Sequence, residues 1–357
     1  MPLTSYEEVR PWARAIRKQV TTREMPPWDA DPAVGEWLDD PSLGEREIAL
    51  ISAWVEAGAP LGNPADLPQP RRFVDGWTIG DPDLILEMPE DFLVPASGSD
   101  RFEYVSLPTG LVEERWVSAV QVLPGNRKVV HHVMAYVDQD EEFEDGWRSR
   151  RGRHENLMTE FAVGNGGDVF LPGTGKLLKP GSSILLEVHY HPYGEATPDR
   201  TRIGFKFHPK GAKARRVVSK GISTRDLHIP AGEASFRSEA DYHLPQPVEI
   251  ISFQPHMHCR GKSMELAALF PDGSRHVLCS VPTFNFNWQI TYTFKSPPRL
   301  PAGTTLHVTA YHDNSAANPN NPDPTTDVWW GPQTTDEMMI GWTDYVVIDE
   351  PEGEPEG

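Results

Sequence analysis

Cysteine, long apolar runs and positive charge are all scarce in this sequence, and each shortage excludes a class of protein. The two cysteines, Cys259 and Cys279, cannot build a disulfide framework, although they could pair with each other or both stay free. No apolar run is long enough to span a bilayer, and the start MPLTSYEEVR has no apolar signal core. With a net charge of −19, the chain is unsuited to nucleic acid or anionic membrane surfaces as partners.

Turn-forming residues are abundant instead. The 357 residues include 35 prolines and 29 glycines, and this share of proline is about twice the usual ~5%. The length suggests two or three domains, each long enough to bury a core of its own. The composition therefore favours short strands joined by turns over long helices.

The first stretch of the chain, residues 1–70, is predicted to be a small helical unit that ends in a proline-rich linker. Ser5 with Glu8, and Ser42 with Glu45, fit capping boxes at the starts of two helices. Apolar residues follow each box at helical spacing. The simplest interpretation is a helical appendage to a larger protein.

Beyond the linker the pattern changes to short strands between turn signals. Residues 71–211 and 212–349 are each predicted to form an antiparallel β-sandwich. The predicted fold class is therefore mainly β: two stacked, jelly-roll-like sandwiches with a short helical N-terminal segment. Pro271-Asp272-Gly273 fits a hairpin turn. The acidic run from Asp138 to Asp145 is expected to be a solvated loop, and the acidic tail 350–357 to be disordered.

The stretch Gln254 to Lys262, QPHMHCRGK, contains two histidines two residues apart. Residues at this spacing face the same side of a strand, so His256 and His258 could reach one metal ion. The alternating apolar residues from Ile251 to Met257 would then face a core. Many such pairs are ordinary surface or core histidines, so this motif requires support from the rest of the chain.

Further histidines occur in the first predicted sandwich. His131 and His132 are adjacent in KVVHHVMAYV, and neighbours on an ideal strand face opposite sides. Both can bind one ion only if the strand twists or ends there, or if the rings use different nitrogens. His189, in LLEVHYHPYG, could complete a three-histidine site. The alternative is the polar exterior of a sandwich.

Methionine adds a different kind of donor near the end of the second sandwich, in Asp336-Glu337-Met338-Met339. Thioether is a soft ligand that favours Cu(I), and imidazole suits both oxidation states of copper. Two histidines with a methionine, beside a three-histidine set, indicate two copper centres with different tasks. Zinc hydrolysis fits less well, because no carboxylate accompanies the histidine pairs as in HExxH.

Four motifs together resemble a known family. VVHHVMAYV, LLEVHYHPYG, PHMHCRGK and TTDEMMIGW occur in the order of the copper type II, ascorbate-dependent monooxygenases, which include peptidylglycine α-hydroxylating and dopamine β-monooxygenases. The resemblance covers residues from about 75 to 349, and the motifs are specific as a set although none is specific alone. It looks closest to bacterial members fused to cytochrome domains, which also show stretches like HDNSAANPNNPDP and QTTDEMM.

The resemblance implies two copper ions per chain, which face each other across a solvent-filled cleft between the sandwiches. The ligands of the electron-transfer copper would be His131, His132 and His189. The ligands of the copper that binds and activates O2, and with them the catalytic residues, would be His256, His258 and Met338. Met339 should face the core instead, because adjacent strand residues point to opposite sides.

The implied reaction is hydroxylation of a C–H bond in a small organic substrate. O2 is the co-substrate: one oxygen atom enters the substrate and the other leaves as water. Two single electrons come from ascorbate or an equivalent one-electron reductant. The resemblance to the bacterial members also implies a periplasmic or other extracytoplasmic location.

The residues that anchor the peptide in the peptidylglycine enzymes differ here. Gln254 occupies the place of an arginine, while Ile340 and Trp342 occupy the places of an asparagine and a tyrosine. Glutamine cannot form the charge-assisted, bidentate pair that arginine makes with a carboxylate. We therefore expect these three residues to contact a neutral, hydrophobic or aromatic substrate.

The N-terminal segment carries a second resemblance. SYEEVRPWARAIRKQV, TREMPPW and EREIALISAWVEAGAP look like the distal part of a bacterial c-type cytochrome domain, so this segment is expected to be a truncated remnant. In an intact domain Met25 would be the axial haem ligand. This sequence contains no CxxCH, so no covalent haem is expected in this chain, and a cytochrome is instead an expected redox partner.

Two other functional classes compete with the monooxygenase. One is a non-catalytic copper protein that stores copper or passes electrons. The other is a structural two-sandwich module with vestigial histidines. Tight binding of two copper ions would exclude the vestigial module, and substrate-dependent O2 consumption would exclude the non-catalytic protein.

Overall fold

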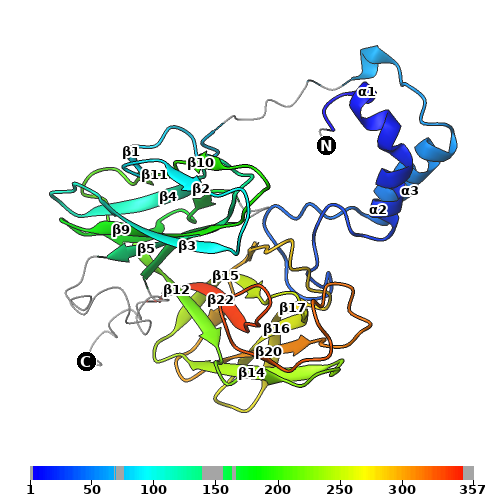
Figure 1. The fold of residues 1–357 in the computed structure, drawn as a ribbon. Helices are drawn as coiled ribbons and strands as arrows, with labels where there is room; N and C mark the ends of the chain where they lie inside the picture. The colour runs from blue at the N-terminus through cyan, green and yellow to red at the C-terminus, as the bar shows by residue number, and fades with distance from the viewer. Residues whose placement is uncertain (1–2, 68, 70–75, 139–155, 163–165, 349–357) are drawn as a thin grey trace.

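The computed structural model describes residues 3–67, 69, 76–138, 156–162 and 166–348. Figure 1 shows two β-sandwiches stacked on each other, with a helical N-terminal segment at one side. The predicted acidic loop after Asp138 and the predicted disordered tail 350–357 lie outside the described residues. None of the helices in the described ranges has the length and apolar character that a membrane crossing requires.

The first sandwich packs two sheets face to face around one apolar core. One sheet has the order β3 (Arg101–Pro108), β9 (Ser183–Tyr190), β5 (Val130–Asp138) and β6 (Leu157–Ala162). The other has the order β1 (Leu84–Glu87), β11 (Arg202–Phe207), β4 (Arg115–Leu123) and β8 (Thr174–Leu178), with β7 (Asp168–Val169) beside β4. A short pair, β2 (Phe92–Val94) and β10 (Thr197–Asp199), completes it. Alternation along β9 sends Leu186, Val188 and Tyr190 into the core, where all three are fully buried.

The second sandwich repeats this arrangement. One sheet has the order β12 (Arg215–Ser223), β22 (Ile340–Val347), β15 (Val248–His256) and β18 (Tyr292–Thr293), with β19 (Arg299–Leu300) beside β15. The other has the order β14 (Phe236–His243), β20 (Thr305–His312), β16 (Gly261–Leu269) and β17 (Arg275–Val281). A short pair, β13 (His228–Ile229) and β21 (Val328–Trp329), lies outside these sheets. The prediction of a mainly β fold with two stacked antiparallel sandwiches is therefore confirmed.

The two sandwiches are joined by a continuous sheet. Strands β8 and β12 pair in parallel over two residues, Thr174 with Arg215 and Gly175 with Arg216. This pairing links the second sheet of the first sandwich to the first sheet of the second, in one ten-stranded sheet. The predicted boundary between residues 211 and 212 lies between β11, in the first sandwich, and β12, in the second.

The N-terminal helices are α1 (Tyr6–Val9), a 3-10 turn η1 (Arg10–Trp12), α2 (Ala13–Thr21) and α3 (Glu45–Glu56). The capping box of Ser5 and Glu8 is confirmed at the start of α1. The box of Ser42 and Glu45 is wrong. Helix α3 begins at Glu45 and is capped by Gly44, whose N–H donates to the Glu47 carboxylate at 2.7 Å. The capping residue is thus two positions later than predicted.

The segment between α2 and α3 belongs to the second sandwich, which corrects the picture of residues 1–70 as a separate helical unit. Figure 1 shows this segment running from the helices to the second sandwich. Trp37 is buried in the core of that sandwich, 4.7 Å from the ring of Phe294. The N–H of Leu38 donates to the carbonyl of Thr293 at 2.8 Å. The predicted linker contains a short 3-10 turn, η2 (Pro64–Asp66).

Candidate metal centre

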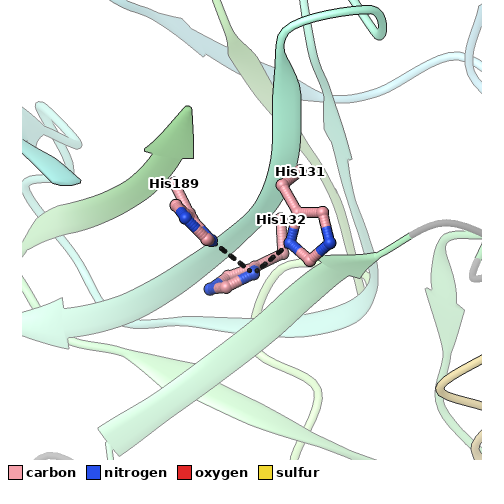
Figure 2. Close-up of side chains that lie close together, drawn as sticks. All are labelled: His131, His132 and His189. Atoms are coloured by element: carbon pink, nitrogen blue, oxygen red, sulfur yellow. Dashed lines mark hydrogen bonds between the residues drawn. The ribbon is translucent and has the colours of Figure 1, made fainter. Parts of the chain in front are cut away.

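A β-bulge in β5 brings two adjacent histidines to one place. Val130 pairs with Tyr190, but His132 pairs with His189, so His131 is an extra residue on its strand. A bulge turns a strand locally, so successive side chains no longer have to face opposite sides. Figure 2 shows the rings of His131, His132 and His189 converging. The strand therefore twists at this pair, which is one of the conditions that the sequence left open.

Each of the three rings directs its Nδ1 atom towards the other two. Nδ1 of His132 lies 3.1 Å from Nδ1 of His131 and 3.3 Å from Nδ1 of His189. Nitrogens bound to one ion at ~2.0–2.1 Å lie roughly 3 Å apart, so these separations fit ligands of a common ion. Three neutral imidazoles cannot satisfy one another at this point by hydrogen bonds alone, and a cation would use all three lone pairs.

Asp100 and Phe102 orient His189. Nε2 of His189 donates to the Asp100 carboxylate at 3.0 Å, which leaves Nδ1 as the atom with the free lone pair. The ring of Phe102 stacks on His189 at 4.3 Å with 8° between the planes. The same carboxylate accepts from the exposed His191 at 2.7 Å. A carboxylate behind a histidine is a common device for fixing the tautomer of a metal ligand.

The second set of donors lies where β15 ends. His256 is the last residue of β15, and His258 belongs to the turn that follows it, rather than to the strand as predicted. A register shift between Ile250 and Ser252 turns Ile251 away from the core of the second sandwich and into a separate cluster. The predicted core face therefore begins at Phe253, because the bulge interrupts the alternation.

Hydrogen bonds give both of these histidines the same tautomer. Nδ1–H of His256 donates to Oε1 of Gln289 at 2.6 Å. Nδ1–H of His258 donates to the carbonyl of Asp336 at 3.2 Å. Nε2 is then the atom with the free lone pair on each ring. The ring centroids lie 5.5 Å apart.

All five imidazoles have lowered pKa values, and burial is the largest cause for each. Burial lowers the pKa of His189 to about 4 and that of His258 to about 3. The pKa values of His131, His132 and His256 also lie below the ordinary value, that of His132 well below it. Neutral imidazole is the form that binds metals, so both sets are in this form at neutral pH.

Glu337 holds the two segments of the second set together. Its side chain is fully buried, and its carboxylate accepts from the backbone N–H groups of His258 at 2.9 Å, Arg260 at 2.6 Å and Met338 at 3.1 Å. Nε2 of His312, also fully buried, donates to the carbonyl of Met338 at 3.2 Å. The turn after β15 and the segment before β22 are therefore fixed relative to each other.

The adjacent methionines point to different places, as predicted, although both lie in the segment before β22 rather than in a strand. Met339 is fully buried in the core of the second sandwich. Met338 is half-buried and lines a cavity together with His256 and His258. A thioether thus lies on the same wall as the two imidazoles.

This cavity, of about 290 Å³, lies between the two sandwiches, because residues of both form its walls. His132 contributes from the first sandwich, and His256 and His258 contribute from the second. Aromatic and aliphatic side chains make up much of the remaining wall: Phe102, Met134, Tyr136, Trp330, Ile340 and Trp342. One histidine of the first set and all three donors of the second therefore line the same cavity.

Phe286 connects the two sets. Its ring centroid lies 6.0 Å from that of His131 and 6.0 Å from that of His258. The resemblance implied a solvent-filled cleft between the two sites. In the structure an aromatic ring contacts one histidine of each set, and apolar side chains line the space beside it.

The three predicted substrate residues separate into two groups. Ile340 and Trp342 line the main cavity. Gln254 does not: its side chain donates to Glu160 at 3.0 Å and lines a smaller cavity behind the wall. The predicted contact between Gln254 and substrate is therefore replaced by a contact with a carboxyl group. Met25, the predicted haem ligand of an intact domain, is exposed beyond α2.

Comparison with known proteins identifies no family. No protein-family model matches the chain, and neither does any curated protein. Among solved structures, the major capsid protein P2 of bacteriophage PM2 has 9% identity, covering 74% of this chain and 97% of its own, with a TM-score of 0.31. The STIV MCP has 8% identity, covering 74% and 96%, with a TM-score of 0.32. Likenesses at this level carry no argument about fold or function.

Sequence reasoning missed the residues that position the donors: Asp100, Gln289, Phe286, Glu337 and His312. Glu337 stood inside a motif, TTDEMMIGW, and His312 begins the quoted stretch HDNSAANPNNPDP, but neither was assigned a role. The other three are remote in sequence from the histidines that they contact. Both cysteines are free in the structure, which resolves the pairing that the sequence left open.

The carboxylate behind His189 gives a direct test of the first site. Asp100→Asn removes the charge and leaves one acceptor oxygen for two histidines. We expect the affinity of the first site for copper to fall by about 10–100-fold, the usual effect of losing such a partner. Competition titration with a Cu(I) chelator measures it, with the exposed Asp81→Asn as the matched control. Unchanged affinity at both sites would show that Asp100 does not support a metal ligand.

Proposed function

We propose that this protein is a copper-dependent monooxygenase that hydroxylates a C–H bond of a small organic substrate. One observation carries the proposal: members of two donor sets of different composition line a single, largely apolar cavity. One is all imidazole, His131 with His132 and His189, and the other combines His256 and His258 with a thioether. The resemblance of the four motifs to the copper type II monooxygenases points to the same chemistry.

The donors fit copper by their chemistry. His131, His132 and His189 would hold one ion through Nδ1, and His256, His258 and Met338 would hold the other through Nε2 and sulfur. Neutral imidazole and thioether together suit an ion that alternates between Cu(I) and Cu(II). When bound, copper supplies one-electron redox chemistry and O2 activation. The overall balance is R–H, O2, two electrons and two protons giving R–OH and water.

The residues of this chain would bind the substrate and keep water away. Trp342 and Ile340 on β22 face Met134 and Tyr136 on β5, and these four side chains form one buried apolar cluster. A cavity of about 290 Å³ is close to the lower limit of ~300 Å³ for small-molecule sites. The walls thus favour a small neutral or aromatic molecule, oriented by contacts with both sandwiches.

Copper titration and O2 consumption test this proposal together. Protein loaded with copper should hold two ions, and in the presence of ascorbate it should consume O2 faster when a substrate is added. A panel of small aromatic and aliphatic compounds, with product analysis for incorporation of one ¹⁸O atom from ¹⁸O2, identifies the substrate. Two bound ions without substrate-dependent O2 consumption would instead favour the non-catalytic copper protein.

Peptides that end in glycine should not be substrates. A peptide carboxylate at the position of Gln254 would meet the carboxyl of Glu160, which is hydrogen-bonded to this glutamine, rather than a cation. A desolvated carboxylate without a positive partner is costly to bind. We therefore expect no hydroxylation of a glycine-extended peptide above the rate without enzyme, measured by mass spectrometry. Efficient turnover of such a peptide would show that another group holds its carboxylate.

A further inference from the structure

Glu160, on β6, lies between two cavities. It lines the main cavity beside His132, His256 and His258. It also lines the second cavity, of about 40 Å³, which lies between the two sandwiches behind the wall. A carboxyl group at this place can exchange a proton with either side.

The second cavity is polar. Lys176, which is buried, reaches into it and donates to the carbonyls of Leu157 and Met158 at 2.9 and 3.0 Å and to the hydroxyl of Ser219 at 2.8 Å. Ser219 in turn donates to Asp344. A volume of about 40 Å³ exceeds the ~10–15 Å³ that one water molecule needs, and the walls offer several hydrogen-bond partners.

The polar cavity extends towards the surface at β7. Asp168, an exposed residue of this strand, lines the cavity, and burial raises the pKa of its carboxyl to about 6. The carboxylate accepts from the hydroxyl of Thr159 at 2.7 Å. Thr159 is the neighbour of Glu160 on β6. Polar groups thus extend from the carboxylate of Asp168 to the wall of the main cavity.

The environment of Glu160 keeps its proton available near neutral pH. Burial is the largest cause that raises its pKa, to about 7, and the charge of Asp168 also raises it. The hydrogen bond from Gln254 acts in the opposite direction and lowers the pKa. Other titratable or charged groups that share a cavity wall with it are Tyr104, His132, Tyr136, Lys176, Glu187, Arg225, His256, His258 and Asp344. Proton donors work best when their pKa is close to the working pH.

We propose that Glu160 delivers protons to the main cavity and is protonated again through the polar cavity between the sandwiches. This inference rests on the proposed function, whose balance requires two protons for each O2. Glu160 would donate one proton from its carboxyl to an oxygen atom of O2 as the one-electron reductant supplies electrons. The carboxylate so formed would take a proton from the hydrogen-bonded groups behind it, and the same cycle would supply the second.

The test compares Glu160→Gln with Glu90→Gln, a change of the same chemistry at an exposed position away from both cavities. Glutamine preserves the shape and can still bind Gln254, but it carries no acidic proton. The first measurement uses metal-free protein and infrared spectroscopy of protonated carboxyl groups from pH 5 to 9. Burial also raises the pKa of Glu337 to about 7, so the signal of Glu160 is the part lost in its variant. Glu90→Gln should lose none of it.

The second measurement is the pH profile of ascorbate-driven O2 consumption by copper-loaded protein, with peroxide or water as the product. The wild-type rate should fall as the pH rises through about 7, because Glu160 loses the proton that it donates. Glu160→Gln should be slower by about 100-fold, the lower end for general acid catalysis, and should lack this decline. Copper content should be equal in all three proteins.

The outcomes separate this inference from the proposed function. If Glu160→Gln keeps the wild-type rate and pH profile, the inference is wrong while the monooxygenase proposal stands. If the infrared signal of the metal-free protein does not change in Glu160→Gln, Glu160 holds no proton near pH 7 and the inference is wrong whatever the activity. If wild-type protein loaded with two copper ions consumes no O2, both proposals are wrong.

Discussion

His256→Ala should leave the protein with one copper ion and no O2 consumption. The substitution removes one of three donors from the second set and leaves His258 and Met338 alone. The first set is unaffected, because its three histidines come from β5 and β9 of the other sandwich. We expect the affinity of the second site to fall by more than the ~10–100-fold that follows loss of an outer-shell partner. Metal analysis after dialysis and Cu(I) titration measure both sites.

His243→Ala is the matched control, because this histidine is exposed on β14 and lines neither cavity. It should keep both ions and the wild-type rate. Thermal unfolding of metal-free protein checks that His256→Ala remains folded. Loss of both ions, or of neither, from His256→Ala would show that the two sets of donors do not act as separate sites.

Met338→Leu should weaken copper binding and Met339→Leu should not, although the residues are adjacent. Leucine has nearly the volume of methionine, and such swaps usually cost less than ~1.5 kcal/mol even in a core. Met339 is fully buried among apolar residues, so its replacement should keep fold, copper and activity. Met338 lies on the wall with His256 and His258, so Met338→Leu should keep the fold and lose the soft donor, which weakens retention of Cu(I).

Truncation to alanine should affect stability more at Met339 than at Met338, whereas replacement by leucine should affect copper binding more at Met338. Met339→Ala leaves a void in a packed core and should lower the free energy of unfolding by about 2–5 kcal/mol. Met338→Ala should cost clearly less, because its side chain is half-buried against the cavity. Denaturant unfolding of metal-free protein and Cu(I) affinity of the two leucine variants decide between the residues. An inactive Met339→Leu beside an active Met338→Leu would show that Met339 is the functional one.

Local patterns predicted the class of the fold. Proline and glycine also identified the hairpin between β16 and β17, where Gly273 has a φ of +86°. Patterns failed where a strand departs from ideal geometry. The extra residue at His131 and the shift at Ile251 change which side each neighbour faces, and nothing local in the sequence distinguishes them from regular strand residues.

The surroundings of the donors could not be predicted for a different reason. Asp100 is 89 residues before His189, Glu160 is 94 before Gln254, and both meet their partners only because strands distant in sequence are neighbours in space. The segment between α2 and α3 illustrates the same point. The sequence predicted that it belongs to a helical unit, yet its Trp37 is buried in the core of the second sandwich.

The sequence by itself determined the class of the fold, because period-two apolar alternation selects half-buried strands. It also supplied the candidate donors, through histidine and methionine motifs that resemble a known family. Only the tertiary structure decided which ring nitrogens converge, that His132 shares a cavity with the second set, and that a buried carboxyl lies between this cavity and a polar one. The reason is physical: alternation depends on neighbours along the chain, whereas convergence, burial and the resulting pKa shifts depend on strands and loops that only packing brings together.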